Sequence, residues 1–152
     1  MPEPMVSYAQ NAEDVILNRV FAGQQTGFYI DVGAWDPDID SVTKHFYLNG
    51  WRGINIEPTD LYYARLAEKR PADINLKVAV GPKVGKAQFV QHGDSGLSGL
   101  VETTERLASF NAISDFSIRQ IEVDVMPLSE ITSRYAAPDV DFLKIDVEGG
   151  ER

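Results

Sequence analysis

Short apolar stretches alternate with amphipathic ones along most of this chain. Apolar-rich runs predict strands over residues 28–32, 53–57, 74–80, 119–126 and 140–147. Apolar residues that recur every three or four positions predict helices over residues 7–23, 41–50, 59–70 and 128–136. Strands that alternate with helices form βαβ units, so we expect an α/β fold with a mainly parallel sheet and helices on both faces.

Capping and turn residues mark the expected ends of these elements. Ser7 and Gln10 form a capping-box pattern at the start of the first helix, and Pro71 ends the third. Residues 85–91 follow a glycine-bounded turn, which predicts a hairpin addition to the third strand. The Gly- and Ser-rich residues 92–100 predict a mobile loop, either a lid over an acceptor or an ordinary surface loop.

Length and composition fit one globular domain. The chain has 152 residues, of which 43% are hydrophobic and 24% charged. We divide this single domain into a helical lead-in, residues 1–26, and a core, residues 27–152. Because the sequence has neither an apolar run of about 18 residues nor a signal-peptide pattern, we expect a cytoplasmic protein without a membrane segment.

Charge and missing residue types narrow the chemistry. The 14 basic and 23 acidic residues give a formal net charge of −9. This charge disfavours nucleic acid as a partner and favours a neutral or cationic small molecule. The chain has no cysteine, so disulfides, thiolate metal sites and a cysteine nucleophile are excluded. Two histidines and the pair Asp146 and Glu148 do not make a convincing cation site, so we expect no bound metal.

Acidic residues gather at one edge of the predicted sheet. Asp31, Glu57 and Asp146 each stand at the end of a predicted parallel strand, and a glycine or proline follows closely in each case. Open α/β sheets bind ligands beyond this edge, and the acids would repel one another without a compensating group. The structural alternative is that Asp31 and Glu57 cap neighbouring helices or pair with Arg52 or Lys44.

Of two candidate cofactors, S-adenosylmethionine fits such an edge better than a dinucleotide does. A dinucleotide needs a G-x-G-x-x-G turn, but Gly33 stands alone and Asp36 would oppose a phosphate. S-adenosylmethionine has no phosphate and carries a sulfonium and an ammonium group. Gly33 would let the backbone approach its methionine part, Asp31 could answer the ammonium, and Glu57 could accept from both ribose hydroxyls.

Six segments of the chain carry a family resemblance. They are, in order, "SYAQNAEDVIL", "GFYIDVGAWDP", "SVTKHFYLNGWRGINIEP", "INLKVAVG", "SGLSGL" and "FLKIDVEGGE". In this order and spacing they resemble the FkbM family of S-adenosylmethionine-dependent methyltransferases, over residues 7–151. The resemblance implies a Rossmann-like class I methyltransferase fold and methyl transfer to oxygen, often on a sugar or a glycan-like acceptor.

The resemblance also implies roles for individual residues. The implied cofactor-binding residues are Asp31, Gly33 and Ala34, then Glu57 with Pro58 for the ribose, and Ala79 and Val80 for the adenine. Asp146 and Glu148 would face the transferred methyl, one of them as the base that removes the hydroxyl proton. Trp35 stands where relatives more often carry a small polar residue, which would narrow the pocket or stack over it.

Relatives continue past "DVEGGE" with a helix and further strands, so we expect this chain to be the N-terminal part of the fold. An interior strand needs a neighbour on each side, and an uncovered strand over residues 140–147 favours self-association.

Other residues have structural explanations beside the functional ones. His45 is expected to pack or cap a helix, His92 to lie in a solvated loop, and Ser41 to start a helix, with a cofactor contact as its second role. Gln10, Glu13 and Asp14 fit the polar face of the first helix. Two rival functions remain: a truncated cofactor-binding domain without turnover, and a nicotinamide-dependent oxidoreductase.

Overall fold

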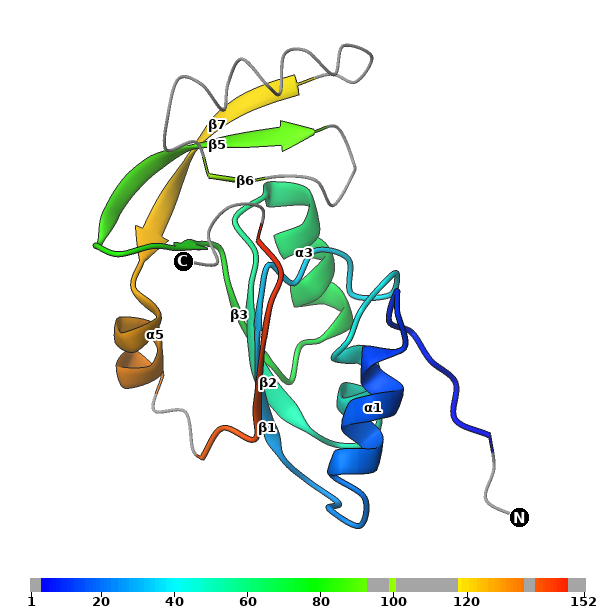
Figure 1. The fold of residues 1–152 in the computed structure, drawn as a ribbon. Coiled ribbons are helices and arrows are strands. Elements are labelled where there is room, and N and C mark those ends of the chain that lie inside the picture. The colour runs from blue at the N-terminus through cyan, green and yellow to red at the C-terminus, as the bar shows by residue number, and fades with distance from the viewer. Residues whose placement is uncertain (1–3, 93–98, 101–117, 136–138, 148–152) are drawn as a thin grey trace.

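The computed structural model describes residues 4–92, 99–100, 118–135 and 139–147 (Figure 1). Helices and strands alternate through the first half of the chain, and strands dominate the second. In chain order the elements are α1 (Glu13–Val20), β1 (Phe28–Val32), α2 (Lys44–Leu48), β2 (Arg52–Ile56), α3 (Asp60–Lys69), β3 (Ile74–Leu76), β4 (Ala79–Val80), β5 (Gly85–His92), β6 (Gly99–Leu100), β7 (Ile118–Met126), α5 (Leu128–Arg134) and β8 (Phe142–Ile145).

The main sheet has the strand order β3-β2-β1-β8, and its strands are all parallel. Figure 1 shows α5 on one side of this sheet and α1 and α3 on the other. The expected α/β fold, a Rossmann-like parallel sheet between helices, is therefore confirmed.

The two faces of β1 bury different chemistry because side chains alternate along a strand. Ile30 and Val32 point to an apolar core that also contains Ile54 and Ile56 of β2 and Ile131 of α5. Tyr29 and Asp31 occupy the opposite face, and both are almost fully buried. This second face of β1 is therefore aromatic near the start of the strand and charged near its carboxyl end.

An aromatic cluster ties α1 to the main sheet. Tyr29, Phe46 and Trp51 form its buried centre, and Phe21 and Phe142 pack against it. The ring centroids of Phe21 and Trp51 lie 5.2 Å apart, and those of Tyr29 and Phe142 lie 5.8 Å apart. This packing holds α1 beside β8, and so it fixes the start of α1 over the carboxyl edge of the sheet.

A second sheet, with the strand order β4-β7-β5-β6, differs from the sequence predictions in two ways. Residues 74–80 are two strands, because the chain leaves the main sheet after β3 and β4 pairs with β7 instead. The expected hairpin with the third strand is wrong, since β5 runs antiparallel to β7 and β6. Val78 packs on the core of the main sheet while Ala79 belongs to the core of the second, so one apolar run serves two sheets.

The predicted loop over residues 92–100 is also described in part. His92 ends β5 and Gly99 belongs to β6, so these two residues lie in strands. Residues 93–98 lie outside the described ranges.

The expected capping box at Ser7 and Gln10 is wrong as well. Helix α1 begins at Glu13, and Ala12 is its N-cap residue. Asp14 is fully buried, and its carboxylate accepts hydrogen bonds from the Ser7 hydroxyl at 2.6 Å and from the Tyr8 backbone N–H at 2.7 Å. A buried acid within the helix therefore organises the preceding segment, where the sequence suggested a cap at Ser7.

Strand β8 pairs with β1 alone within the described residues. Its side chains Leu143 and Ile145 are 44% and 47% exposed on the face that looks toward α5. Self-association through this strand stays a prediction.

Candidate functional site

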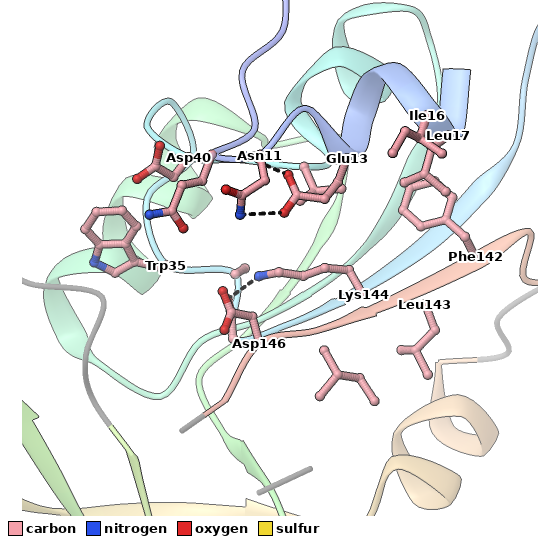
Figure 2. A pocket seen from close by; sticks show the side chains of 15 residues that line it. Asn11, Glu13, Ile16, Leu17, Trp35, Asp40, Phe142, Leu143, Lys144 and Asp146 are labelled. Atoms are coloured by element: carbon pink, nitrogen blue, oxygen red, sulfur yellow. Dashed lines mark hydrogen bonds between the residues drawn. The ribbon is translucent and has the colours of Figure 1, made fainter. Parts of the chain in front are cut away.

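A cavity of about 780 Å³ opens at the carboxyl edge of β1 and β8, under the start of α1 (Figure 2). Its walls come from three parts of the chain: the segment around α1, the loop after β1, and β8 with the residues that follow it. The lining residues are Gln10, Asn11, Glu13, Ile16, Leu17, Gly33, Ala34, Trp35, Asp40, Val42, Phe142, Leu143, Lys144, Ile145 and Asp146. The cavity thus lies where ligands bind in open α/β sheets.

Gly33 has a steric reason to be glycine. Its φ is +72°, a left-handed conformation that favours glycine, and a Cβ at this position would overlap the carbonyl oxygen of Asp146. Its backbone N–H donates to the carbonyl of Ile56 at 3.0 Å. The room left by the missing Cβ is taken by the end of β8, so Gly33 brings Asp146 next to the loop after β1.

Lys144 is the central charge of the cavity, and the sequence analysis did not single it out. Its ammonium donates to the Gly33 carbonyl oxygen at 2.6 Å and lies 3.0 Å from Asp31 Oδ1. Asp31 is 1% exposed, and its Oδ2 accepts from the Thr43 hydroxyl at 2.7 Å. Asp31 is absent from the cavity wall. Both oxygens of Asp31 therefore face protein groups, and Lys144 stands between Asp31 and the cavity.

Ser41 and Thr43 are held by a buried arginine. Arg70, 2% exposed, donates to the Thr43 hydroxyl at 2.6 Å, to the Ser41 hydroxyl at 2.6 Å and to the Pro37 carbonyl at 2.9 Å. Ser41 does not begin α2, whose N-cap residue is Thr43. The Ser41 hydroxyl is engaged in fixing the loop after β1, and it does not line this cavity.

Glu57 directly follows β2 beside that loop and is 5% exposed. Its Oε1 accepts from the Thr59 backbone N–H at 2.9 Å and from the Thr59 hydroxyl at 2.6 Å, and its Oε2 accepts from the Trp35 backbone N–H at 3.0 Å. Burial raises the pKa of this carboxyl above its usual range, and the hydrogen bonds from Thr59 and Trp35 oppose the rise. A carboxylate has about four acceptor positions, so these three bonds leave about one for a ligand.

Strained backbone surrounds the cavity. Ala12, Trp35 and Asp40 have positive φ values of 59°, 50° and 51°, and among the described non-glycine residues no others do. Trp35 and Asp40 line the cavity, and Ala12 lies between two residues that do. Residues held in such conformations cluster at ligand-binding sites, where surrounding structure must enforce them.

Trp35 forms one wall of the cavity. Its ring lies 5.3 Å from the ring of Tyr62, which is a buried residue of α3. Its indole N–H is buried and has no hydrogen-bond partner within the part of the chain that the structure describes. A buried donor without a partner is unusual, and here it belongs to a residue that borders the cavity.

Gln10 and Glu13, which were expected on the polar face of the first helix, line the cavity together with Asn11. Glu13 accepts from the Asn11 backbone N–H at 2.9 Å and from the Asn11 amide at 3.2 Å. Partial burial raises the pKa of Glu13, but the hydrogen bonds from the Glu13 and Asn11 backbones and the Asn11 amide outweigh it and lower the pKa. The position of Asn11 and Glu13 over β8 depends on the aromatic cluster. No local sequence pattern reveals that cluster.

The structure does not bring all the predicted site residues together. Gly33, Ala34 and Asp146 line the cavity, and Asp31 lies behind Lys144. The described residues Glu57, Pro58, Ala79 and Val80 are absent from its wall. Ala79 is buried in the core of the second sheet, and Val80 packs against the core of the main sheet. Glu148 lies outside the described residues.

His45 and the search for metal ligands add two observations. The His45 imidazole pairs with Asn18 at 3.2 Å on the outside of α2, and burial lowers its pKa. Within the described ranges, no group of three or more His, Cys, Asp or Glu side chains is placed to hold a metal ion. None of the helices described here is long and apolar enough to cross a membrane.

A parallel α/β sheet with a ligand-sized cavity at its carboxyl edge is typical of Rossmann-like proteins, and this is the class to which the fold belongs. The sequence of residues 31–152 matches the family described as the methyltransferase FkbM domain. The chain therefore belongs to the FkbM methyltransferase family, as the motifs in the sequence indicated. Comparisons with curated proteins and with solved structures gave no match.

Proposed function

We propose that this chain is an S-adenosylmethionine-dependent O-methyltransferase that acts on a hydroxyl group of a sugar, a glycan or another small acceptor. The observation that carries the proposal is the cavity at the carboxyl edge of β1 and β8 in an FkbM domain, bordered by three residues with strained backbone.

The charges of the cavity wall suit this cofactor. Glu13, Asp40 and Asp146 supply negative charge for the sulfonium and ammonium groups. Lys144 supplies one positive charge near Gly33. A dinucleotide would bring two phosphates to a wall with three acids and one base, so the nicotinamide alternative fits less well.

For methyl transfer, the protein mainly has to position the acceptor hydroxyl and remove its proton. S-adenosylmethionine, when bound, supplies a methyl group on a sulfonium. Asp146 lines the cavity with an exposed side chain, which supports a role as base. Its carboxylate would take the proton of the acceptor hydroxyl as the oxygen bonds to the methyl carbon, the bond from that carbon to sulfur breaks and S-adenosylhomocysteine leaves. Glu148 is the alternative base.

The first test is calorimetric titration of the 152-residue chain with S-adenosylhomocysteine, with NADH as the comparison ligand. Saturable binding of S-adenosylhomocysteine without a response to NADH supports the proposal. The reverse pattern, or silence with both ligands from a folded sample, contradicts it.

A second test separates turnover from cofactor binding alone. Transfer of labelled methyl from S-adenosylmethionine to a panel of monosaccharides and glycosides is measured for Asp146→Asn and Glu148→Gln, with Asp139→Asn as an exposed control. We expect one of the two site variants to lose transfer by about 100-fold or more while it keeps its affinity for S-adenosylhomocysteine. Full activity in both would contradict a carboxylate base, and binding without any transfer would favour the domain without turnover.

A further inference from the structure

Lys144 is a nearly buried lysine whose ammonium faces the cavity. Its side chain is 16% exposed and extends from β8 between Asn11 and Glu13 on one side and Asp146 on the other (Figure 2). The ammonium has three N–H donors. It donates to the Gly33 carbonyl oxygen at 2.6 Å and forms an ion pair with Asp31 Oδ1 at 3.0 Å. Within the described part of the chain, the Gly33 carbonyl is the hydrogen-bond acceptor of the ammonium, so Lys144 keeps donor capacity for a ligand.

Among the described residues that line the cavity, Lys144 is the only one with a positively charged side chain. The other charged residues of the wall are the acids Glu13, Asp40 and Asp146. A ligand carboxylate placed against any of these would be repelled, whereas one placed at Lys144 would meet a cation held in a fixed position.

Asp31 pairs with Lys144 and does not itself line the cavity. It is 1% exposed, lies outside the cavity wall, and has its two oxygens directed at Thr43 and Lys144. The sequence analysis expected Asp31 to answer the cofactor ammonium. In the structure Lys144 lies between Asp31 and the cavity, so we assign Asp31 the part of a positioning residue for Lys144.

We propose that the Lys144 ammonium binds the carboxylate of the cofactor's amino-acid end, with Asp31 and the Gly33 carbonyl holding it in place. This inference rests on the proposed function, because it concerns the same cofactor. The neighbouring acids of the wall then receive the ammonium of the same amino-acid end, so the two charges of the ligand meet two opposite charges of the protein.

The inference is tested by titrating the chain with three ligands that differ at one end. S-adenosylhomocysteine carries the carboxylate and the ammonium, decarboxylated S-adenosylhomocysteine keeps only the ammonium, and 5′-methylthioadenosine has neither. Hydrogen bonds to charged groups contribute enough for a preference of about 10- to 100-fold. We expect the unmodified chain to prefer S-adenosylhomocysteine over its decarboxylated form by that factor.

Two variants assign this preference to Lys144. Lys144→Met is expected to lose most of the preference and to bind the other two ligands within about threefold of the unmodified chain. Lys44→Met is the matched control, because Lys44 is similarly buried at 21% exposure but pairs with Asp38 outside the cavity wall. If Lys144→Met is too unstable, the variant Asp31→Asn with Lys144→Met removes both charges and is expected to lose the preference as well.

The outcomes that overturn the inference differ from those that overturn the proposed function. Equal binding of S-adenosylhomocysteine and its decarboxylated form by the unmodified chain overturns the inference, and so does a preference that survives Lys144→Met. If the unmodified chain binds none of the three ligands, the proposed function fails and the inference falls with it.

Discussion

Asp31 and Lys144 are directly paired across two parallel strands, and their charged atoms lie 3.0 Å apart at the wall of the cavity, which Lys144 lines. Asp31 belongs to β1 and Lys144 to β8, so residues 113 positions apart in the chain meet only because these strands pair. The pair neutralises two nearly buried charges at the edge where the acids of the sheet gather.

Breaking this pair should be costly, while removing both charges should not. Asp31→Asn leaves the Lys144 ammonium without its counter-charge, and Lys144→Met leaves the Asp31 carboxylate buried and unpaired. We expect each to lower the free energy of unfolding by about 3 kcal/mol in urea denaturation. The double variant should lose clearly less than the sum of the two, and additive losses would mean that the pair is not coupled.

Gly33→Ala should destabilise the chain more than an alanine at another glycine with positive φ. Gly23→Ala is the control, because Gly23 has a φ of +89° and no atom within 4 Å of an added Cβ. Both variants carry the left-handed penalty of about 1 to 2 kcal/mol. Only Gly33→Ala also pushes against the Asp146 carbonyl, so we expect an extra loss of roughly 1 to 3 kcal/mol in urea denaturation. Equal losses would mean that the end of β8 moves aside freely.

The strands of the main sheet and the acids at their ends could be predicted from the sequence. β1 and β2 are short apolar runs followed within two residues by Gly or Pro, and this local pattern survives folding because these two strands are buried between neighbours. Gly33 was predicted to let the backbone approach the cofactor, and that stays a prediction; in the structure the group that approaches Gly33 is the backbone of Asp146.

Lys144 and the wall residues Asn11 and Glu13 could not be found from local sequence patterns. A lysine within a strand gives no local sign that it faces a buried acid, since that depends on the register of β1 with β8. Asn11 and Glu13 reach the cavity because aromatic side chains from β1, α2, β8 and the chain beside α1 and β2 hold α1 in place. The change of sheet after β3 depends on the pairing of β4 with β7, which is equally non-local.

Arg70→Lys should disturb the loop after β1 although both residues carry a positive charge. The guanidinium of Arg70 reaches three acceptors from one planar group, and a lysine ammonium at the same site cannot match that geometry. We expect a loss of about 3 kcal/mol in the free energy of unfolding. Arg65→Lys is the control, because Arg65 is 38% exposed and pairs with Asp36, and its loss should stay below about 1 kcal/mol. Similar losses in both would contradict the role given to Arg70.

Trp35 should report ligand binding through its fluorescence. The chain has two tryptophans, and Trp35 lines the cavity while Trp51 is 3% exposed within the aromatic cluster. S-adenosylhomocysteine should therefore change the emission of Trp51→Phe, in which Trp35 is the remaining tryptophan. The change should be absent in Trp35→Phe, with calorimetry to show that this variant still binds. A response that persists in Trp35→Phe would place the ligand elsewhere.

The raised pKa of Glu57 predicts that its contribution to stability decreases as the pH rises. Burial raises its folded-state pKa above 4.5, so between these two pKa values the folded chain holds a proton that the unfolded chain has lost. The contribution of Glu57 to the free energy of unfolding is therefore greatest at low pH and is lost as the pH rises through the folded-state pKa. Glu57→Gln has no such proton, so the stability difference between the unmodified chain and Glu57→Gln should shrink as the pH rises from about 4.5 to 7.

Urea denaturation at closely spaced pH values measures this difference. Asp73, whose pKa is also raised by burial, is present in both proteins, so its contribution cancels. Asp38→Asn is the control with the opposite sign, because the hydrogen bond from Lys44 lowers the pKa of Asp38 below 3.8. The stability that Asp38 contributes is lost only as the pH falls through that lowered value, so its difference should stay flat between pH 4.5 and 7. If the Glu57→Gln difference also stays flat, or grows with pH, the carboxyl is ionised in the fold at its ordinary pKa or below. It would then be available to a ligand as a full negative charge throughout the neutral range.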